Sequence, residues 1–255
     1  MTLVLLHSAG ASPEIWDRVR SFLVGVPILV PALPGRAGAG SPADDVATHA
    51  SAVIRAMDDV GVARAAIGGH SLGGAVALWL AINEPSRVAG IGVANAGARM
   101  RVAPQMLEAL PDGLEPILDL VAASNFPEGS PADWIAERRA AYATIGGETL
   151  LADLTACDRF DVLDRLWEIR CRTQVLAGSE DQLTPPRFAR LMAERISAAR
   201  YTEYTGAGHM LPIERPAEVA GELAVLWAST LDGRLTQAPG APAARSGSSA
   251  PRPAG

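Results

Sequence analysis

The chain has 255 residues, 49% of them hydrophobic, which is enough to bury a full core as one domain with an insertion. Charged residues make up 20%, the formal net charge is −6, and lysine is absent. This acidic balance excludes the basic surface that is typical of nucleic-acid-binding proteins.

Cys157 and Cys171 are the only cysteines, and they give neither a disulfide framework nor a metal-binding spacing. The apolar run near the N-terminus is too short for a signal peptide, and no run is long enough to span a membrane. We therefore expect a cytoplasmic protein with a small-molecule substrate and no cofactor, metal, nucleic-acid partner or membrane contact. The sequence does not indicate an oligomeric state.

Short β-like runs alternate with amphipathic helical stretches, which is the pattern of a parallel sheet covered on both faces. The predicted strands are Leu3–Leu6, Ile28–Val30, Ala65–Gly68, Ile91–Asn95, Thr173–Ala177 and Ala199–Tyr204. The predicted helices of this core are Pro13–Val24, Asp44–Asp59, Gly74–Ala81, Pro186–Ile196 and Ala217–Leu231.

The stretch from about Arg99 to Asp161 breaks this alternation, because it holds helical segments with no clear strand among them. Those segments are Pro104–Leu110, Glu115–Ala123, Pro131–Tyr142 and Glu148–Thr155. We divide the chain into an α/β core (residues 1–98 and 162–232) and an inserted helical cap (residues 99–161). Residues 233–255 are rich in Pro, Ala, Ser and Gly and are expected to be disordered.

The pentapeptide Gly69-His70-Ser71-Leu72-Gly73 has the form G-x-S-x-G and lies between a predicted strand and a predicted helix. That context is typical of a nucleophile elbow, a sharp turn that exposes a serine hydroxyl. A serine hydroxyl is a weak nucleophile until a nearby base takes its proton. Ser71 is therefore the candidate nucleophile, and the chain must also supply a base and a carboxylate.

The base can be found by elimination, because there are only four histidines. His49 lies in the middle of a helix and is expected at the surface or its boundary. His70 would point away from Ser71, and His7 is expected to brace its neighbouring loop. His209 follows a predicted strand in a glycine-flanked loop, from which an imidazole can reach Ser71, so it is the candidate general base and acid.

The carboxylate should follow a strand at the same edge of the sheet. The loop after Ile91–Asn95 contains no acid, whereas the loop after Thr173–Ala177 contains Glu180 and Asp181. We choose Asp181, with Glu180 as its competitor, to orient the imidazole and stabilise its charged form. The remaining acids are expected to be solvated or to cap helices.

An oxyanion needs two backbone N–H donors that are in place before the charge develops. One is predicted to be Leu72, the residue after the nucleophile. The other is predicted in the loop His7-Ser8-Ala9-Gly10 after the first strand, where Ala9 is best placed.

These motifs resemble the α/β-hydrolase family, in its capped esterase, lactonase and peroxidase-like group. The resemblance spans Leu3 to Leu231. It rests on the elbow and on three further motifs: Leu5-Leu6-His7 with Trp16 downstream, Ala177-Gly178-Ser179-Glu180-Asp181 followed by Thr184-Pro185-Pro186, and Gly208-His209 followed by Glu214-Arg215-Pro216. The order Ser71, Asp181, His209 is the order that this family uses. The last two motifs and the cap are most similar to 3-oxoadipate enol-lactonases. The resemblance implies an α/β-hydrolase fold with an inserted cap.

Two departures from the family pattern stand out. Ser8 replaces the glycine that usually follows the strand-end histidine, which affects the expected shape of the oxyanion loop. The N-terminal hairpin that usually precedes the His7 strand is missing from this sequence, so a sheet of about six strands is expected.

Three functions fit these residues. The first is a serine hydrolase that cleaves a small ester, lactone or thioester through an acyl-enzyme. The second uses the same triad for C–C bond hydrolysis, perhydrolysis or a biosynthetic rearrangement. The third is a binding module that has the fold without turnover, because a fold alone does not establish a function. The intact Ser71, Asp181 and His209 set favours an enzyme.

Overall fold

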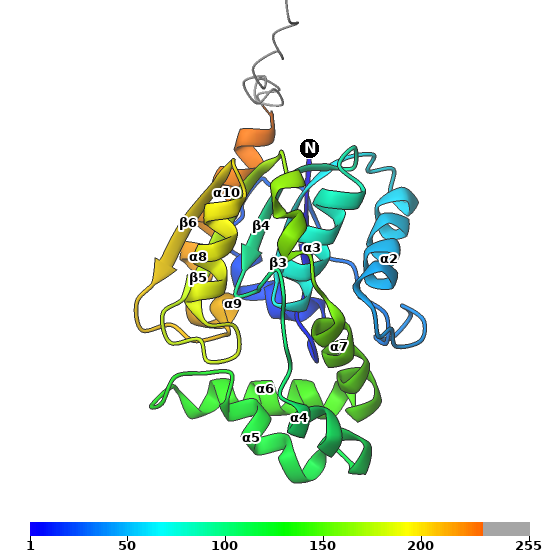
Figure 1. Ribbon diagram of the computed structural model, residues 1–255, viewed down its shortest axis with the longest axis vertical. Helices are drawn as coiled ribbons and strands as arrows, with labels where there is room; N and C mark the ends of the chain where they lie inside the picture. Colours follow the sequence, from blue (N-terminus) through cyan, green and yellow to red (C-terminus); the bar gives the residue numbers. More distant parts are fainter. Residues whose placement is uncertain (232–255) are drawn as a thin grey trace, which may run out of the picture.

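Six strands form one sheet in the computed structural model, which describes residues 1–231 (Figure 1). The strands are β1 Thr2–Leu6, β2 Ile28–Leu29, β3 Ala65–His70, β4 Val88–Ala94, β5 Arg172–Gly178 and β6 Ala199–Tyr204. Their order is β2-β1-β3-β4-β5-β6, and every neighbouring pair is parallel. The predicted parallel sheet is confirmed, and the tail predicted for residues 233–255 lies outside the described residues.

Helices cover both faces of the sheet because side chains alternate along each strand. Val4 and Leu6 of β1 belong to one core cluster, and Leu3 and Leu5 belong to the other. The first face is covered by α2 (Val46–Asp59), α3 (Leu72–Asn83), η4 (Leu163–Glu168) and α8 (Pro186–Arg195). The second is covered by η1 (Pro13–Trp16), α1 (Asp17–Arg20), α9 (Leu211–Glu214) and α10 (Pro216–Leu231).

The predicted helix Pro13–Val24 is wrong in its second half. It forms only the short elements η1 and α1 and ends at Arg20. Beyond that point two apolar side chains find no core to pack against, since Phe22 is 56% exposed and Val24 is 90% exposed. Gly25 then takes a positive φ of 78°, which is incompatible with a continuing right-handed helix.

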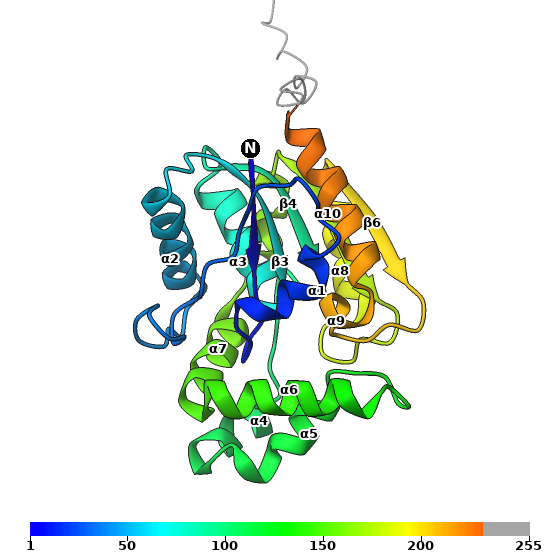
Figure 2. The same ribbon diagram turned by 180° about the vertical axis from the view of Figure 1, so that it is seen from behind.

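Apart from η4, the helices between β4 and β5 gather beyond the carboxyl ends of the strands, as Figures 1 and 2 show from opposite sides. They are α4 (Pro104–Ala109), η2 (Leu110–Asp112), η3 (Glu115–Ile117), α5 (Leu118–Ala123), α6 (Ala132–Ile145) and α7 (Gly147–Arg159). We call them the cap. They share an apolar cluster of their own that includes Leu118, Val121 and Tyr142.

An isolated bridge joins Arg99 to Asp161, where the chain leaves the sheet for the cap and returns from it. The Arg99 Nε also donates to Asp161 Oδ2 at 2.5 Å. These contacts support the predicted boundaries at residues 99 and 161, and the division into core and cap stays a prediction.

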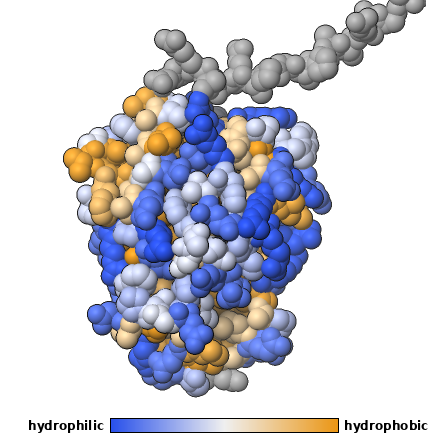
Figure 3. All heavy atoms as spheres, turned by 90° about the vertical axis from the view of Figure 1, so that its left-hand side faces the viewer, coloured by the Kyte–Doolittle hydropathy of each residue, from blue (hydrophilic) through white to orange (hydrophobic). Residues whose placement is uncertain are grey.

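The surface on the β6 side of the molecule is largely hydrophilic, and its hydrophobic residues lie in small separate areas (Figure 3). Within residues 1–231, no helix is both long enough and apolar enough to cross a lipid bilayer.

Candidate active site

Ser71 lies on a sharp turn between β3 and α3. Its backbone angles are φ 53° and ψ −113°, a region that residues with a side chain rarely adopt. The turn requires glycines, because a Cβ on Gly69 would lie 2.0 Å from the Gly73 carbonyl oxygen and one on Gly73 would lie 2.2 Å from the Leu6 carbonyl oxygen. The sequence therefore folds locally as a strained strand-to-helix turn with Ser71 at its apex.

His209 and Asp181 come from the loops after β6 and β5, and their side chains meet. His209 Nδ1 lies 2.8 Å from Asp181 Oδ2, and both residues are buried. Asp181 Oδ1 accepts hydrogen bonds from the backbone N–H groups of Leu183 (2.8 Å) and Thr184 (2.9 Å). Asp181 Oδ2 also accepts from the Thr184 hydroxyl at 2.6 Å. Glu180, the competing carboxylate, is exposed.

The surroundings of Asp181 keep its carboxyl ionised. Burial by itself raises the pKa of this carboxyl, but the charge of His209 and the hydrogen bonds from His209 and Thr184 outweigh that effect and hold the pKa at about 2. An ionised carboxylate can only accept hydrogen bonds. A neutral His209 ring therefore carries its proton on Nδ1, which leaves Nε2 free to accept a proton.

Ser71 and His209 line one cavity of about 280 Å³ between the sheet edge and the cap. Cap residues such as Met106, Val121 and Tyr142 form apolar parts of its wall, and no Asp or Glu among the described residues lines it. The Ser71 hydroxyl makes no hydrogen bond within residues 1–231. Catalytic hydrogen bonds are often long in a free enzyme and shorten when substrate binds.

Cys157 also lines this cavity, so it is a second possible nucleophile. Burial, together with the nearby carboxylates of Asp153 and Asp158, raises the pKa of its thiol. Since the thiolate is the reactive form of cysteine, these surroundings suppress its reactivity and leave Ser71 as the candidate nucleophile. No group of three His, Cys, Asp or Glu side chains in the described part of the chain is placed to hold a metal ion.

The two predicted oxyanion donors have free N–H groups. No hydrogen bond among residues 1–231 uses the backbone N–H of Ala9 or of Leu72, and Leu72 is the first residue of α3, where N–H groups have no partner within the helix. Ser8 does not have a positive φ, so its position does not require the conformational freedom of glycine. The positive φ in this loop, 56°, belongs to Gly10.

Three side chains whose roles the sequence did not reveal fix the loop that carries His209. Asn95 Nδ2 donates to the carbonyls of Gly208 and His209, each at 2.7 Å, and His70 Nε2 donates to the His209 carbonyl at 2.6 Å. The Glu214 carboxylate accepts from the N–H groups of Gly208 and Met210 at 2.7 and 2.8 Å. Two signals were present in the sequence: His70 directly precedes the candidate nucleophile, and Glu214 belongs to the motif that follows Gly208-His209.

The chain is similar to several known hydrolases. A model of the alpha/beta hydrolase family matches residues 3–222. A candidate carbamate hydrolase, RutD, from Variovorax paradoxus is 30% identical, with 94% of each chain covered. A pimeloyl-[acyl-carrier protein] methyl ester esterase from Aromatoleum aromaticum is 26% identical over 86% of this chain and 94% of its own. The enol-lactonase from Burkholderia xenovorans has a similar fold, with a TM-score of 0.81, 23% identity and coverage of 89% and 90%.

Proposed function

The chain belongs to the alpha/beta hydrolase family, and we propose that it is a serine hydrolase that cleaves a small ester, lactone or thioester through an acyl-enzyme. The observation that carries the proposal is the 2.8 Å contact between His209 Nδ1 and Asp181 Oδ2, beside a cavity that Ser71 and His209 both line. A base, its orienting carboxylate and a strained serine are the parts that acyl transfer requires.

In the proposed mechanism, Ser71 Oγ attacks the substrate carbonyl carbon while His209 Nε2 takes the serine proton. The carbonyl oxygen becomes an oxyanion and accepts hydrogen bonds from the N–H groups of Ala9 and Leu72. The bond to the leaving oxygen or sulfur then breaks, and His209 returns the proton to that atom. A water molecule, deprotonated by the same imidazole, hydrolyses the acyl-enzyme and regenerates Ser71. Asp181 stays ionised throughout and orients the ring.

The size and charge of the cavity favour a substrate whose acyl group is small and either neutral or anionic. Its volume of about 280 Å³ and its apolar cap wall suit a short acyl chain or a lactone ring. Arg101 and Arg138 line it while no acidic residue among those described does. A cationic substrate would therefore meet like charge and no compensating carboxylate.

Carbamate hydrolysis is the second candidate, and the relative named for it at 30% identity favours it. A carbamate carbonyl can react with the same serine and the same oxyanion donors. The alternatives of C–C bond hydrolysis, perhydrolysis or a rearrangement also use this triad, whereas a binding module would use the fold alone.

A fluorophosphonate probe and a substrate panel test the proposal. We expect the probe to label the wild-type protein and not Ser71→Ala. The panel should contain p-nitrophenyl acetate and butyrate, a γ-lactone, an aryl thioacetate and a carbamate ester. Folded wild-type protein that takes no label would refute the serine mechanism and favour a binding module. Labelling without turnover of any panel member would favour C–C cleavage, perhydrolysis or rearrangement.

A further inference from the structure

Arg138 of α6 holds two carbonyl groups of the loop that carries the candidate oxyanion donor Ala9. This loop, residues 8–11, lies in no helix or strand, so its conformation depends on other contacts. Arg138 Nη2 donates to the Ala9 carbonyl at 2.7 Å, and Nη1 donates to the Gly10 carbonyl at 2.9 Å. Its guanidinium carbon lies 3.9 Å from the centre of the Tyr142 ring, which supports the group from the cap side.

The charge of Arg138 is buried and is not neutralised by an acid. The residue is 2% exposed, and no carboxylate whose side chain the structure describes forms an ion pair with it. Removing such a charge from water is unfavourable, and hydrogen bonds to backbone carbonyls offset that cost only in part. The positive charge of Arg138 therefore lies at the cavity wall, beside the place where the proposed reaction develops negative charge.

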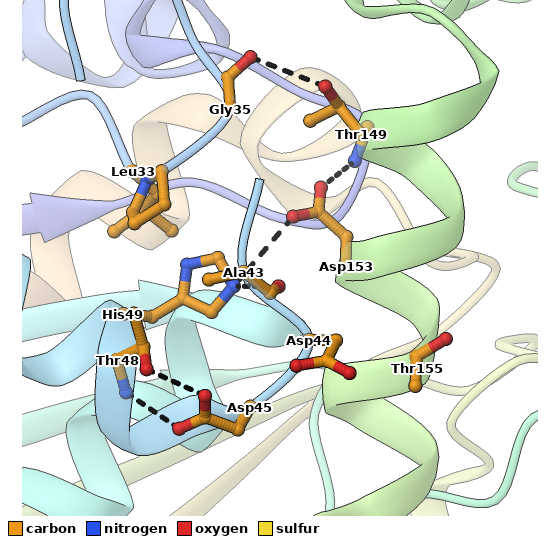
Figure 4. A network of polar contacts seen from close by, with 12 residues as sticks. Leu33, Gly35, Ala43, Asp44, Asp45, Thr48, His49, Thr149, Asp153 and Thr155 are labelled. Carbon is orange, nitrogen blue, oxygen red and sulfur yellow. Dashed lines mark hydrogen bonds and ion pairs between the residues drawn. The ribbon is translucent and has the colours of Figure 1, made fainter. Parts of the chain in front are cut away.

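A second buried residue of the cap, Asp153, also holds residues 8–11, together with its partner Arg36. Asp153 of α7 pairs with Arg36 through two bonds, of 2.8 and 2.6 Å. Asp153 Oδ2 also accepts the Gly10 N–H at 2.8 Å, and Arg36 Nε donates to the Ala11 carbonyl at 2.8 Å. Figure 4 shows Asp153 reaching from α7 toward His49 of α2. The charges of Arg36 and Asp153 neutralise each other, whereas the charge of Arg138 has no carboxylate partner among the described side chains.

Asn125, which follows α5, contacts both Arg138 and the backbone of the candidate base His209. Arg138 Nε donates to Asn125 Oδ1 at 3.3 Å, and the Tyr142 hydroxyl donates to the same oxygen at 3.2 Å. The Asn125 carbonyl in turn accepts the backbone N–H of His209 at 3.0 Å. One set of cap residues therefore contacts both the oxyanion loop and the His209 loop.

We propose that Arg138 is a positioning residue that fixes the Ala9 N–H for the oxyanion, so that docking of the cap completes the oxyanion hole. The Arg36–Asp153 pair is the second anchor of the loop. The inference rests on the proposed serine hydrolase function. Because a misplacement of about 1 Å can cost about 10²-fold in rate, loss of the Arg138 contacts should appear in kcat.

The test compares Arg138→Met, Arg138→Lys and Arg139→Met on the best substrate of the panel. Active sites are titrated with the fluorophosphonate, so that kcat refers to functional protein only. Arg139 is the matched control, because it is the next residue of α6 but is paired on the surface with Glu115 and Asp119. Binding of phenylboronic acid, whose tetrahedral adduct with serine mimics the oxyanion, is measured in parallel.

We expect Arg138→Met to lower kcat about 10²-fold with KM within about threefold of wild type, and to weaken boronate binding in parallel. Arg138→Lys should recover part of both losses, and Arg139→Met should match wild type. If Arg138→Met does not fold, Arg138→Lys alone decides by its own kcat and boronate affinity. A kcat close to wild type, or an equal loss in Arg139→Met, overturns the inference. An inactive, unlabelled wild-type protein refutes the proposed function instead.

Discussion

Replacing Asp181 by asparagine should disable the base while changing the site very little. The introduced amide would keep its oxygen on the N–H groups of Leu183 and Thr184, which now bond to Asp181 Oδ1 at 2.8 and 2.9 Å. Its NH2 group would then face His209 Nδ1 in place of the carboxylate oxygen at 2.8 Å. A donor there requires an unprotonated Nδ1, so the ring proton moves to Nε2, the nitrogen that must accept the Ser71 proton.

The expected loss in kcat is about 10⁴-fold, the size found when a triad carboxylate is replaced by an amide and the imidazole is held in the wrong tautomer. Hydrolysis of p-nitrophenyl acetate measures it, with circular dichroism to show that the variant is folded. The matched control is Glu180→Gln on the adjacent residue, whose side chain is exposed. A loss in Glu180→Gln as large as in Asp181→Asn, or a loss below about tenfold in Asp181→Asn, would refute the assignment.

The same substitution predicts a change in acid stability. The folded-state pKa of Asp181, about 2, lies below its ordinary value of 3.8, so the ionised carboxylate stabilises the fold above the higher value. That contribution, about 2–3 kcal/mol, is lost as the pH falls from about 4 to about 2. Urea unfolding of wild type and Asp181→Asn across this range should show the wild type losing more stability. Parallel curves would contradict the reasoning.

Three further substitutions have defined outcomes. Gly10→Ala would place a Cβ 2.4 Å from the Tyr142 ring. It should therefore displace the cap and lower kcat about tenfold or more in the same ester assay. An unchanged kcat would argue against a docked cap. Glu214→Gln leaves Gly208 or Met210 without its acceptor and should cost about 1–3 kcal/mol in urea unfolding, which an unshifted midpoint would rule out. Asn95→Ala removes two donors from the His209 loop and should lower kcat about tenfold; full activity would show that the loop needs no such brace.

The sequence by itself determined the local features of this protein. The alternation of short strands and helices predicted the parallel sheet, because side-chain periodicity follows from burial of both faces. The Gly69 to Gly73 motif predicted a sharp turn, because a Cβ at either glycine would collide with backbone. The order of Ser71, Asp181 and His209 predicted which loops must meet, and the structure brings Asp181 and His209 together. Their catalytic roles stay predictions.

The tertiary structure alone decided the roles of the buried polar residues. The sequence placed His49 at the surface or its boundary and the remaining acids in solvent or at helix ends. The first expectation is wrong, because His49 is fully buried, and the second is wrong for Asp153 and Glu214, which are also buried. Asp153 lies 117 positions from its partner Arg36, and Arg138 lies 129 positions from the Ala9 carbonyl that it holds. A charged residue is solvated or buried according to partners that only the folded chain brings near, so no local pattern could distinguish buried Arg138 from its partly exposed neighbour Arg139.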